Sequence, residues 1–305
     1  MDSKASLEPA VLSSAMTQPD SMARWASLWL ADWLPALPLL VVAYGLLVAP
    51  VVALLFQSVL SDDGQLTLAN WIEVLTSKGD RRAIITSLKL GFVSATSSMV
   101  IGGPIAWFIS RMLPVSQAAW LALLNMATNF SGIGLAFGFV SLLGTYGMVT
   151  LAFQELGVPF VPPTPGSFWG LVLAYNYTNI PLFVLLTIAG MGILRHSWWE
   201  AAQTCGATQW RFWRSIGLPI LLPFLGAGWL LVFTWSLGLY GIPLALAGNG
   251  ATRKVNLITL DIGDILRASI SGQGEAAVLA MILLVLASGS LLAYRWMIHR
   301  GAKWF

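Results

Sequence analysis

Residues 215–252 read SIGLPILLPFLGAGWLLVFTWSLGLYGIPLALAGNGAT and contain no Asp, Glu, Lys or Arg. Five further stretches lack charged residues in the same way: 33–61, 90–110, 112–154, 156–194 and 276–294. About 20 consecutive apolar residues are enough for a helix to cross the hydrocarbon core of a bilayer. The sequence therefore predicts an integral membrane protein with about six spans.

The composition excludes a soluble enzyme. The 305 residues are 57% hydrophobic and 10% charged, with a mean hydropathy of +0.77, whereas soluble domains average about 45–50% apolar and 25% charged residues. Continuous apolar runs favour helices over the ten-residue alternation of a membrane barrel. The expected fold class is all-α, with spans at Leu34–Leu60, Ser87–Ser110, Ala118–Leu143, Phe168–Ile193, Ile220–Leu246 and Glu275–Met297. A single cysteine, Cys205, excludes an internal disulfide.

The two ends of the spans differ in positive charge. Residues 1–24 are polar and predict a disordered cytoplasmic tail, and residues 25–305 predict one transmembrane domain. The first apolar run is too long for the core of a signal peptide and is expected to stay uncleaved. One side carries nine basic residues: Lys4, Arg24, Arg111, Arg195, Arg211, Arg214, Arg295, Arg300 and Lys303. The other side carries six: Lys78, Arg81, Arg82, Arg253, Lys254 and Arg267. The positive-inside rule then places both termini in the cytoplasm.

Two outer features follow from this orientation. The segment VPFVPPTPG at 158–166 is rich in proline and cannot continue a helix. It is expected to follow a short amphipathic segment at 147–156.

The inner loop 194–219 is the most informative stretch, and after Leu194 it reads RHSWWEAAQTCGATQWRFWRSIGLP. Ser197 with Glu200 three residues later fits a capping box at the start of a short helix. Gly206 suits a left-handed cap at its end. A second helical piece is expected over 208–215, before a span that begins at Pro219. The loop is therefore predicted to form a helix-turn-helix elbow on the cytoplasmic surface.

This loop resembles the hallmark of the inner-membrane permease subunits of binding-protein-dependent ABC importers. The hallmark is Glu-Ala-Ala, three residues, Gly, nine residues, Ile, one residue and Leu-Pro. All spacings are kept here by Glu200, Ala201, Ala202, Gly206, Ile216, Leu218 and Pro219. The resemblance implies the MetI-like fold of type I importers and assigns these seven residues to a helix that couples the permease to a separate ATPase.

The resemblance also implies partners and a location. We expect two ATP-binding cassette ATPases, a second and similar permease, and a periplasmic solute-binding protein, all at a bacterial inner membrane. ATP and Mg²⁺ would be bound by the partner ATPase, and no cofactor or metal is expected in this chain. None of the five lysines follows a glycine, so the chain lacks the Gly-Lys pair of a phosphate-binding loop.

Weaker patterns concern the solute. The residues 102–106 (GGPIA) ahead of Arg111, and 238–246 (GLYGIPLAL), resemble polyamine-type permeases. Leu239 and 271–273 (SGQ) depart from that pattern, and Tyr-Gly-Ile-Pro also resembles permeases for ferric ion or phosphonates. Thr204-Cys205-Gly206 argues against the sugar branch. A polyamine such as spermidine or putrescine is therefore favoured, with aminophosphonates, ferric ion and other anions as alternatives.

Two other classes of function are weighed against the importer. A secondary transporter or channel would be expected to place ionisable groups deep within its helices, and the six uncharged stretches hold none. A membrane enzyme needs clustered His, Asp or Glu, but His196 and His299 both fall at the cytoplasmic edge.

Polar residues within the spans are candidates for the solute pathway or for hydrogen bonds between helices, because polar side chains are costly in lipid. They are Asn125, Thr128, Asn129, Tyr175, Asn176 and Asn179, and the aromatic Trp235 and Tyr240 could face a cationic solute or anchor the interface. Asp261, Asp264 and Glu275 could meet a receptor or a cation, or be solvated loop charges. Gly134 and Gly138 are expected to allow close helix packing inside the subunit, with the contact to a second permease as the alternative, and Cys205 is expected to be a buried small hydrophobe.

Overall fold

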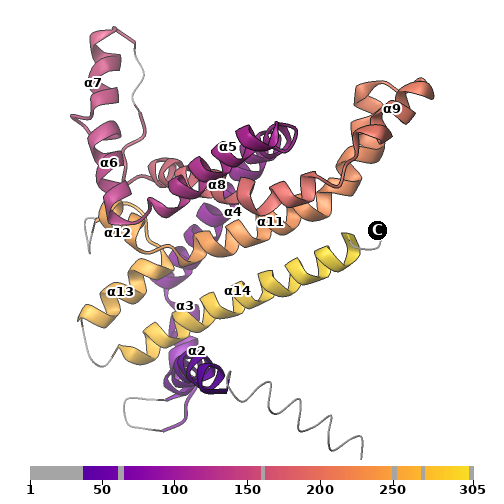
Figure 1. The fold of residues 1–305 in the computed structure, drawn as a ribbon. Helices are drawn as coiled ribbons and strands as arrows, with labels where there is room; N and C mark the ends of the chain where they lie inside the picture. Colours follow the sequence, from indigo (N-terminus) through magenta and orange to yellow (C-terminus); the bar gives the residue numbers. More distant parts are fainter. Residues whose placement is uncertain (1–36, 61–64, 159–161, 249–252, 269–271, 302–305) are drawn as a thin grey trace, which may run out of the picture. The chain divides into compact units, whose positions relative to one another are not determined.

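The computed structural model describes residues 37–60, 65–158, 162–248, 253–268 and 272–301. Apart from an isolated bridge between Leu60 and Leu66, regular structure in these ranges is helical (Figure 1). The elements are α2 Leu37–Val59, α3 Ala69–Thr76, α4 Lys78–Ser110, α5 Pro114–Asn129, α6 Ile133–Leu143, α7 Met148–Glu155, α8 Phe168–Met191, α9 His196–Thr204, α10 Gln209–Phe212, the π-helix η1 Trp213–Gly217, α11 Leu218–Gly238, α12 Gly241–Ala247, α13 Ile258–Ala268 and α14 Gln273–Gly301. The predicted tail 1–24 lies outside the described residues.

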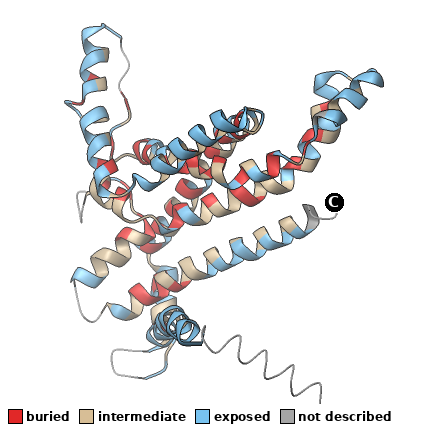
Figure 2. Cartoon of the chain, in the orientation of Figure 1, coloured by how far each residue is buried: buried red, intermediate tan, exposed pale blue. Residues whose placement is uncertain are grey.

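The chain divides into two units, residues 1–53 and 54–305. In the first, the described part of α2 is apolar and exposed on nearly all of its faces (Figure 2). A helix that is apolar all round is suited to lipid rather than to water. The second unit holds α3 to α14 and is the part that positions the functional site.

Six helical segments of the described chain are long and apolar enough to cross a membrane, the number that the sequence predicts. The third differs from its predicted position: it covers Ile133–Glu155 instead of Ala118–Leu143. The predicted span is not one helix, because α5 ends at Asn129 and α6 begins at Ile133. Between them Gly132 has φ +80°, a left-handed conformation that glycine adopts without strain and that a helix cannot contain. The short segment predicted at 147–156 is confirmed as α7.

The fifth span also ends earlier than predicted. The apolar run continues to Leu246, but α11 stops at Gly238 and α12 starts at Gly241. Pro243 lies in the first turn of α12, where the missing N–H has no partner within the helix and a proline is well tolerated. Leu239 is extended.

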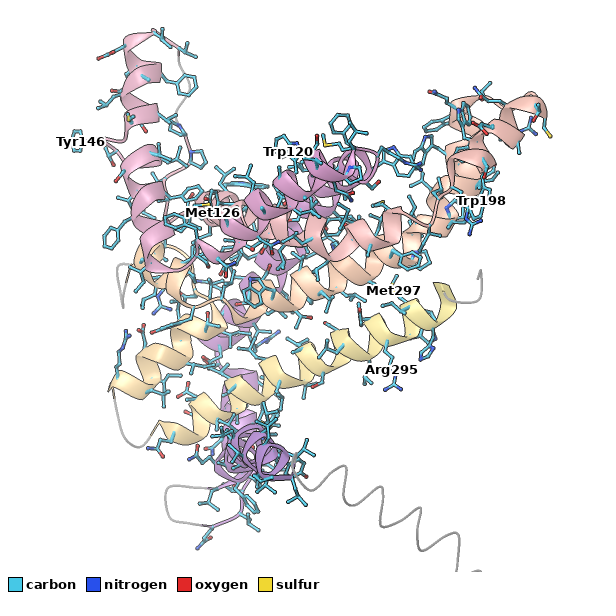
Figure 3. All side chains as sticks on the ribbon, viewed as in Figure 1. Trp120, Met126, Tyr146, Trp198, Arg295 and Met297 are labelled. Atoms are coloured by element: carbon cyan, nitrogen blue, oxygen red, sulfur yellow. The ribbon has the colours of Figure 1, made fainter. Side chains whose placement is uncertain are left out.

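The helices α4, α8 and α11 contact one another, and α14 and α5 pack against α11 and α8 respectively. Most buried residues of the unit lie on this central trio (Figure 2). Glycines allow the close approach: a Cβ on Gly102 would lie 3.0 Å from the Phe183 ring, and one on Gly228 would lie 2.5 Å from Thr187 Cγ2. Met297 of α14 likewise covers Gly226 of α11 (Figure 3). Small residues are the usual means of packing helices in membranes.

Gly134 and Gly138 do not serve the packing predicted for them. A Cβ on either residue would meet no atom within 4 Å. The neighbouring Ile133 and Phe137 are exposed as well. This side of α6 therefore packs against nothing in the described chain.

The close contact at Gly228 leads to a test of the fold. Gly228→Leu is expected to lower the stability of the purified chain by about 1–3 kcal/mol, because the new side chain must displace Thr187 and Phe183. Thermal unfolding in detergent, followed through tryptophan fluorescence, measures the effect. Gly289→Leu on α14 is the matched control, since no atom lies within 4 Å of its Cβ position, and it should unfold like the wild type. Equal melting temperatures for Gly228→Leu and the wild type would contradict this packing.

Candidate functional site

The predicted elbow is present and begins with α9. The helix starts at His196, with Arg195 as a cap residue that provides no side-chain hydrogen bond. The capping box predicted for Ser197 and Glu200 is therefore wrong, because Ser197 lies already within the first turn. Thr204 ends the helix and donates its hydroxyl to the carbonyls of Glu200 and Ala201, at 3.0 and 2.9 Å.

The turn after α9 depends on Gly206, as predicted. Gly206 has φ +74°, in the left-handed region. Its N–H donates to the Gln203 carbonyl at 2.8 Å, and the Ala207 N–H donates to the Ala202 carbonyl at 3.0 Å. This pair of bonds is the Schellman motif, which satisfies the last carbonyls of a helix and reverses the chain.

The second arm of the elbow runs straight into a span. Thr208 caps α10, its hydroxyl accepting from the Arg211 N–H. Then α10, η1 and α11 follow without a break, and Gln209–Gly238 forms one segment long enough to cross a membrane. The π-turn precedes Pro219, where a regular helix would lose a hydrogen bond and meet the proline ring. The second piece predicted over 208–215 is thus joined to the span.

The inner face of the elbow is an aromatic cluster. The rings of Trp199 and Phe212 meet edge to face with centroids 5.3 Å apart, which joins the two arms. Trp213 meets Trp107 of α4 in the same way at 4.8 Å. Ala202 and Ile216, two residues of the importer pattern, pack against the same cluster. Aromatic pairs of this geometry each contribute about 0.5–1.5 kcal/mol beyond their buried area.

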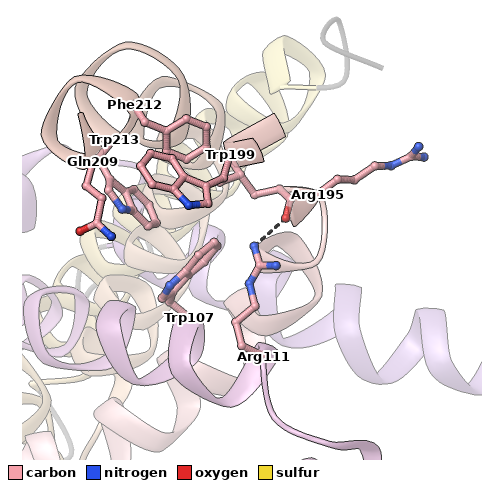
Figure 4. Close-up of a pocket in the computed structure, with 8 residues that line it drawn as sticks. Trp107, Arg111, Arg195, Trp199, Gln209, Phe212 and Trp213 are labelled. Atoms are coloured by element: carbon pink, nitrogen blue, oxygen red, sulfur yellow. Dashed lines mark hydrogen bonds between the residues drawn. The ribbon is translucent and has the colours of Figure 1, made fainter. Parts of the chain in front are cut away.

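Arg111, the residue that follows α4, ties the end of that helix to the elbow. Its guanidinium donates from Nη2 to the Leu194 carbonyl at 2.6 Å and lies 4.1 Å from the centre of the Trp107 ring (Figure 4). A cavity of about 520 Å³ opens beside this contact. It is lined by Trp107, Arg111, Leu194, Arg195, Trp199, Gln209, Phe212 and Trp213. The sequence drew attention to Arg111 only through a weak pattern and gave no role to the aromatic residues.

The outer face of the elbow carries the rest of the importer pattern. Glu200, Ala201, Gly206, Leu218 and Pro219 are exposed. Exposed small side chains permit another protein to approach the backbone closely. Cys205, which directly precedes the turn at Gly206, is exposed too, which corrects the expectation that it is buried.

The polar residues of α8 connect the central helices. Asn176 Oδ1 accepts hydrogen bonds from Ser97 and Ser98 of α4, at 2.9 and 3.1 Å. Asn179 is fully buried and donates to Ser236 Oγ of α11 at 2.8 Å. Tyr175 is buried in the apolar core beside them. The sequence left two roles open for these residues, the solute pathway and hydrogen bonds between helices. The contacts of Asn176 and Asn179 are hydrogen bonds between helices.

The remaining pathway candidates are dispersed. Asn125, Thr128 and Asn129 return their hydrogen bonds to the backbone of α5 and stay at least partly exposed. Trp235 is 52% exposed on α11 and lines a cavity of about 380 Å³. The Tyr240 hydroxyl accepts from Arg267 at 2.9 Å. Tyr240 packs against the apolar cluster that contains Tyr175 of α8, and a role of these residues in the pathway stays a prediction.

Two of the three carboxylates Asp261, Asp264 and Glu275 share a partner. Asp261 and Asp264 of α13 both accept from the guanidinium of Arg253. Burial raises the pKa of Asp261, while Arg253 opposes this rise. Among the described residues no group of three or more His, Cys, Asp or Glu is placed to hold a metal ion. Glu275 lies in the first turn of α14.

Comparison with known proteins identifies the family. Residues 120–299, which include the whole elbow, match the family described as "Binding-protein-dependent transport system inner membrane component". The sulfate transport system permease protein CysT of Escherichia coli K12 is 31% identical over 208 residues, covering 67% of this chain and 70% of CysT. The molybdenum transport system permease protein ModB of the same strain is 27% identical over 222 residues, or 71% of this chain and 92% of ModB.

Solved structures agree with the fold. A bacterial alginate ABC transporter, in complex with an alginate pentasaccharide-bound periplasmic protein, has a chain that superposes with a TM-score of 0.71 at 18% identity. The match covers 90% of this chain and 97% of that one. The chain therefore belongs to the binding-protein-dependent transport system inner membrane components, as a multi-pass permease with the MetI-like fold of type I ABC importers.

Proposed function

We propose that this permease admits a small oxyanion of the sulfate and molybdate class and is driven by ATP hydrolysis on a separate subunit. The observation that carries the proposal is the match to the sulfate permease, at 31% identity over two thirds of the chain. The molybdenum permease supports the same class, since sulfate and molybdate are both tetrahedral dianions.

The chemistry of the spans is compatible with this solute. The uncharged stretches of the spans hold no carboxylate, and the polar groups of Ser97, Ser236 and Asn179 are engaged in hydrogen bonds between the central helices. A polyamine carries several positive charges and would gain from carboxylates along its path. The comparisons do not support the preference for polyamines, which remains a prediction, as do aminophosphonates and ferric ion.

In the proposed mechanism the elbow is the segment that couples the permease to the ATPase. Of the seven coupling residues, the exposed Glu200, Ala201, Gly206, Leu218 and Pro219 would face the ATPase, while Ala202 and Ile216 would hold the elbow to the aromatic cluster. The small exposed face of α9 would contact the ATPase, while the aromatic face stays attached to α4 and α8. Closure of two ATPases on ATP and Mg²⁺ would move the elbow. The movement would reach α11 directly, because α11 continues from the elbow, and it would reach α4 through the bond between Arg111 and Leu194.

The proposal includes the rest of the assembly. A second permease would complete the pathway and a periplasmic receptor would deliver the solute. The bias of Lys and Arg supports cytoplasmic termini and a cytoplasmic elbow. Affinity would belong to the receptor, because tight binding in the pathway would slow release.

Uptake by the assembled complex in proteoliposomes tests the proposal. We expect ATP-dependent accumulation of labelled sulfate or molybdate, competed by the unlabelled anion and dependent on the receptor. Labelled spermidine should not accumulate. Accumulation of spermidine instead of either anion would overturn the oxyanion proposal. Transport by the purified chain alone under a pH gradient would favour a secondary transporter.

A further inference from the structure

A second cavity lies at the far end of α4 from the elbow. It has a volume of about 280 Å³ and is lined by Arg82, Thr86, Phe168, Arg253, Lys254, Val255 and Asn256. Arg82 and Arg111 are separated by about 40 Å along the helix, at 1.5 Å per residue. The two cavities therefore lie at opposite ends of α4.

The wall of this cavity holds three cations and no carboxylate. Arg82 and Lys254 are exposed, and neither forms an ion pair within the described ranges. The Asn256 side chain makes no hydrogen bond there either. Thr86 differs, because its hydroxyl already donates to the Arg82 carbonyl at 2.7 Å. Two cationic groups and one amide thus have donors to offer a ligand.

Arg253 is the third cation of the wall, and its side chain is held in place by other residues. Its side chain is only 4% exposed. Nη1 donates to Asp261 Oδ1 at 2.8 Å and Nη2 donates to Asp264. Nε is buried and has no hydrogen-bond partner in the structure. The Nε–H of this guanidinium therefore lacks an acceptor, which is unfavourable for a buried donor.

The segment that carries Arg253 is anchored to α4. The Ile258 N–H donates to Ser87 Oγ at 3.0 Å. Val255, Leu257 and Ile258 are buried. The position of the guanidinium is therefore fixed by backbone and core contacts.

We propose that this cavity binds a small oxyanion, of which sulfate is the type, through Arg82, Arg253, Lys254 and Asn256. The cavity wall itself carries three cations and no carboxylate, while Asp261 and Asp264 are bound to Arg253, so an anion is attracted to Arg82 and Lys254. The planar guanidinium matches the oxygens of an oxyanion. The identity of the anion rests on the proposed function, and the site would then hold the solute between the receptor and the pathway. Because Arg82 and Lys254 are exposed, their attraction is screened by salt, which keeps binding weak enough for release.

Chemical protection of Lys254 tests the site. The full-length chain in lipid nanodiscs is treated with an amine-reactive acetylating reagent, with sodium sulfate or with sodium chloride at equal ionic strength. Labelling of each lysine is followed by peptide mass spectrometry. Sulfate is expected to slow acetylation of Lys254 saturably, by about fivefold or more. Lys78, an exposed lysine at the start of α4, should react at the same rate in both salts.

Matched variants refine the test. Arg82→Gln should weaken the protection of Lys254, while Arg81→Gln, which removes the same charge from a residue that does not line the cavity, should not. Equal rates for Lys254 in both salts, or equal slowing of Lys254 and Lys78, would overturn the site.

The readout is independent of transport. Protection of Lys254 in a complex that does not import sulfate or molybdate would support the anion site and overturn the proposed solute. Import of either anion without protection would overturn the site and leave the proposed function standing.

Discussion

A Gly206→Pro chain is expected to insert into the membrane normally and to lose about 99% of solute uptake. Proline fixes φ near −65°, whereas Gly206 has φ +74° and donates its N–H to Gln203. The substitution therefore removes the turn that orients α9 relative to α10. A hundredfold loss corresponds to about 2.7 kcal/mol, which is within the combined effect of strain and lost hydrogen bonds. Receptor- and ATP-dependent uptake, divided by the amount of chain in the membrane, gives the value.

Gly206→Asn is the matched control for this prediction. Asparagine tolerates the left-handed region better than other residues with a side chain, and it retains the N–H. Its uptake should stay within about threefold of the wild type. Normal uptake by Gly206→Pro would show that the shape of the elbow is not needed for transport.

Arg111→Ala should reduce uptake about tenfold while the complex still hydrolyses ATP. The change removes the 2.6 Å hydrogen bond to Leu194 and the contact with Trp107, so α4 no longer follows the elbow. Arg111→Lys should not restore uptake, since an ammonium lacks the planar group that stacks on the ring. Uptake and ATP hydrolysis are measured on the same proteoliposomes, and the ratio of the two reports coupling.

Arg295→Ala provides the comparison for charge alone. Arg295 is an exposed arginine of α14 (Figure 3), and its removal should leave the ratio unchanged. An equal loss in Arg295→Ala and Arg111→Ala would mean that positive charge at the membrane surface, and not the link to Leu194, is responsible.

The number of spans could be predicted from the sequence because length and apolarity alone decide whether a helix can cross a bilayer. Breaks inside apolar stretches could not be read in this way. Gly132 interrupts the expected third span, and α12 is separate from α11, although neither break coincides with a charged residue. Gly134 and Gly138 matched a packing pattern, but a pattern does not say which helix faces it.

The elbow was predicted from local spacing, and its local features agree best with expectation. Gly206 and the two helical arms are where the pattern places them, while the N-terminal cap of α9 is Arg195, two residues before the predicted Ser197. The contacts that attach the elbow to the bundle were not predicted. Arg111 and Leu194 are 83 positions apart, and a single sequence carries no direct signal for such a pair.

The most direct test of the account uses Cys205, the only cysteine of the chain, which is exposed on the elbow. A membrane-impermeant maleimide is applied to sealed vesicles of either orientation, with and without the ATPase subunits. We expect labelling of Cys205 only when the cytoplasmic face is outside, and a marked decrease in the labelling rate when the ATPases are bound. Labelling from the periplasmic face, or a rate that the ATPases do not change, would contradict the claim that this elbow couples the permease to its motor.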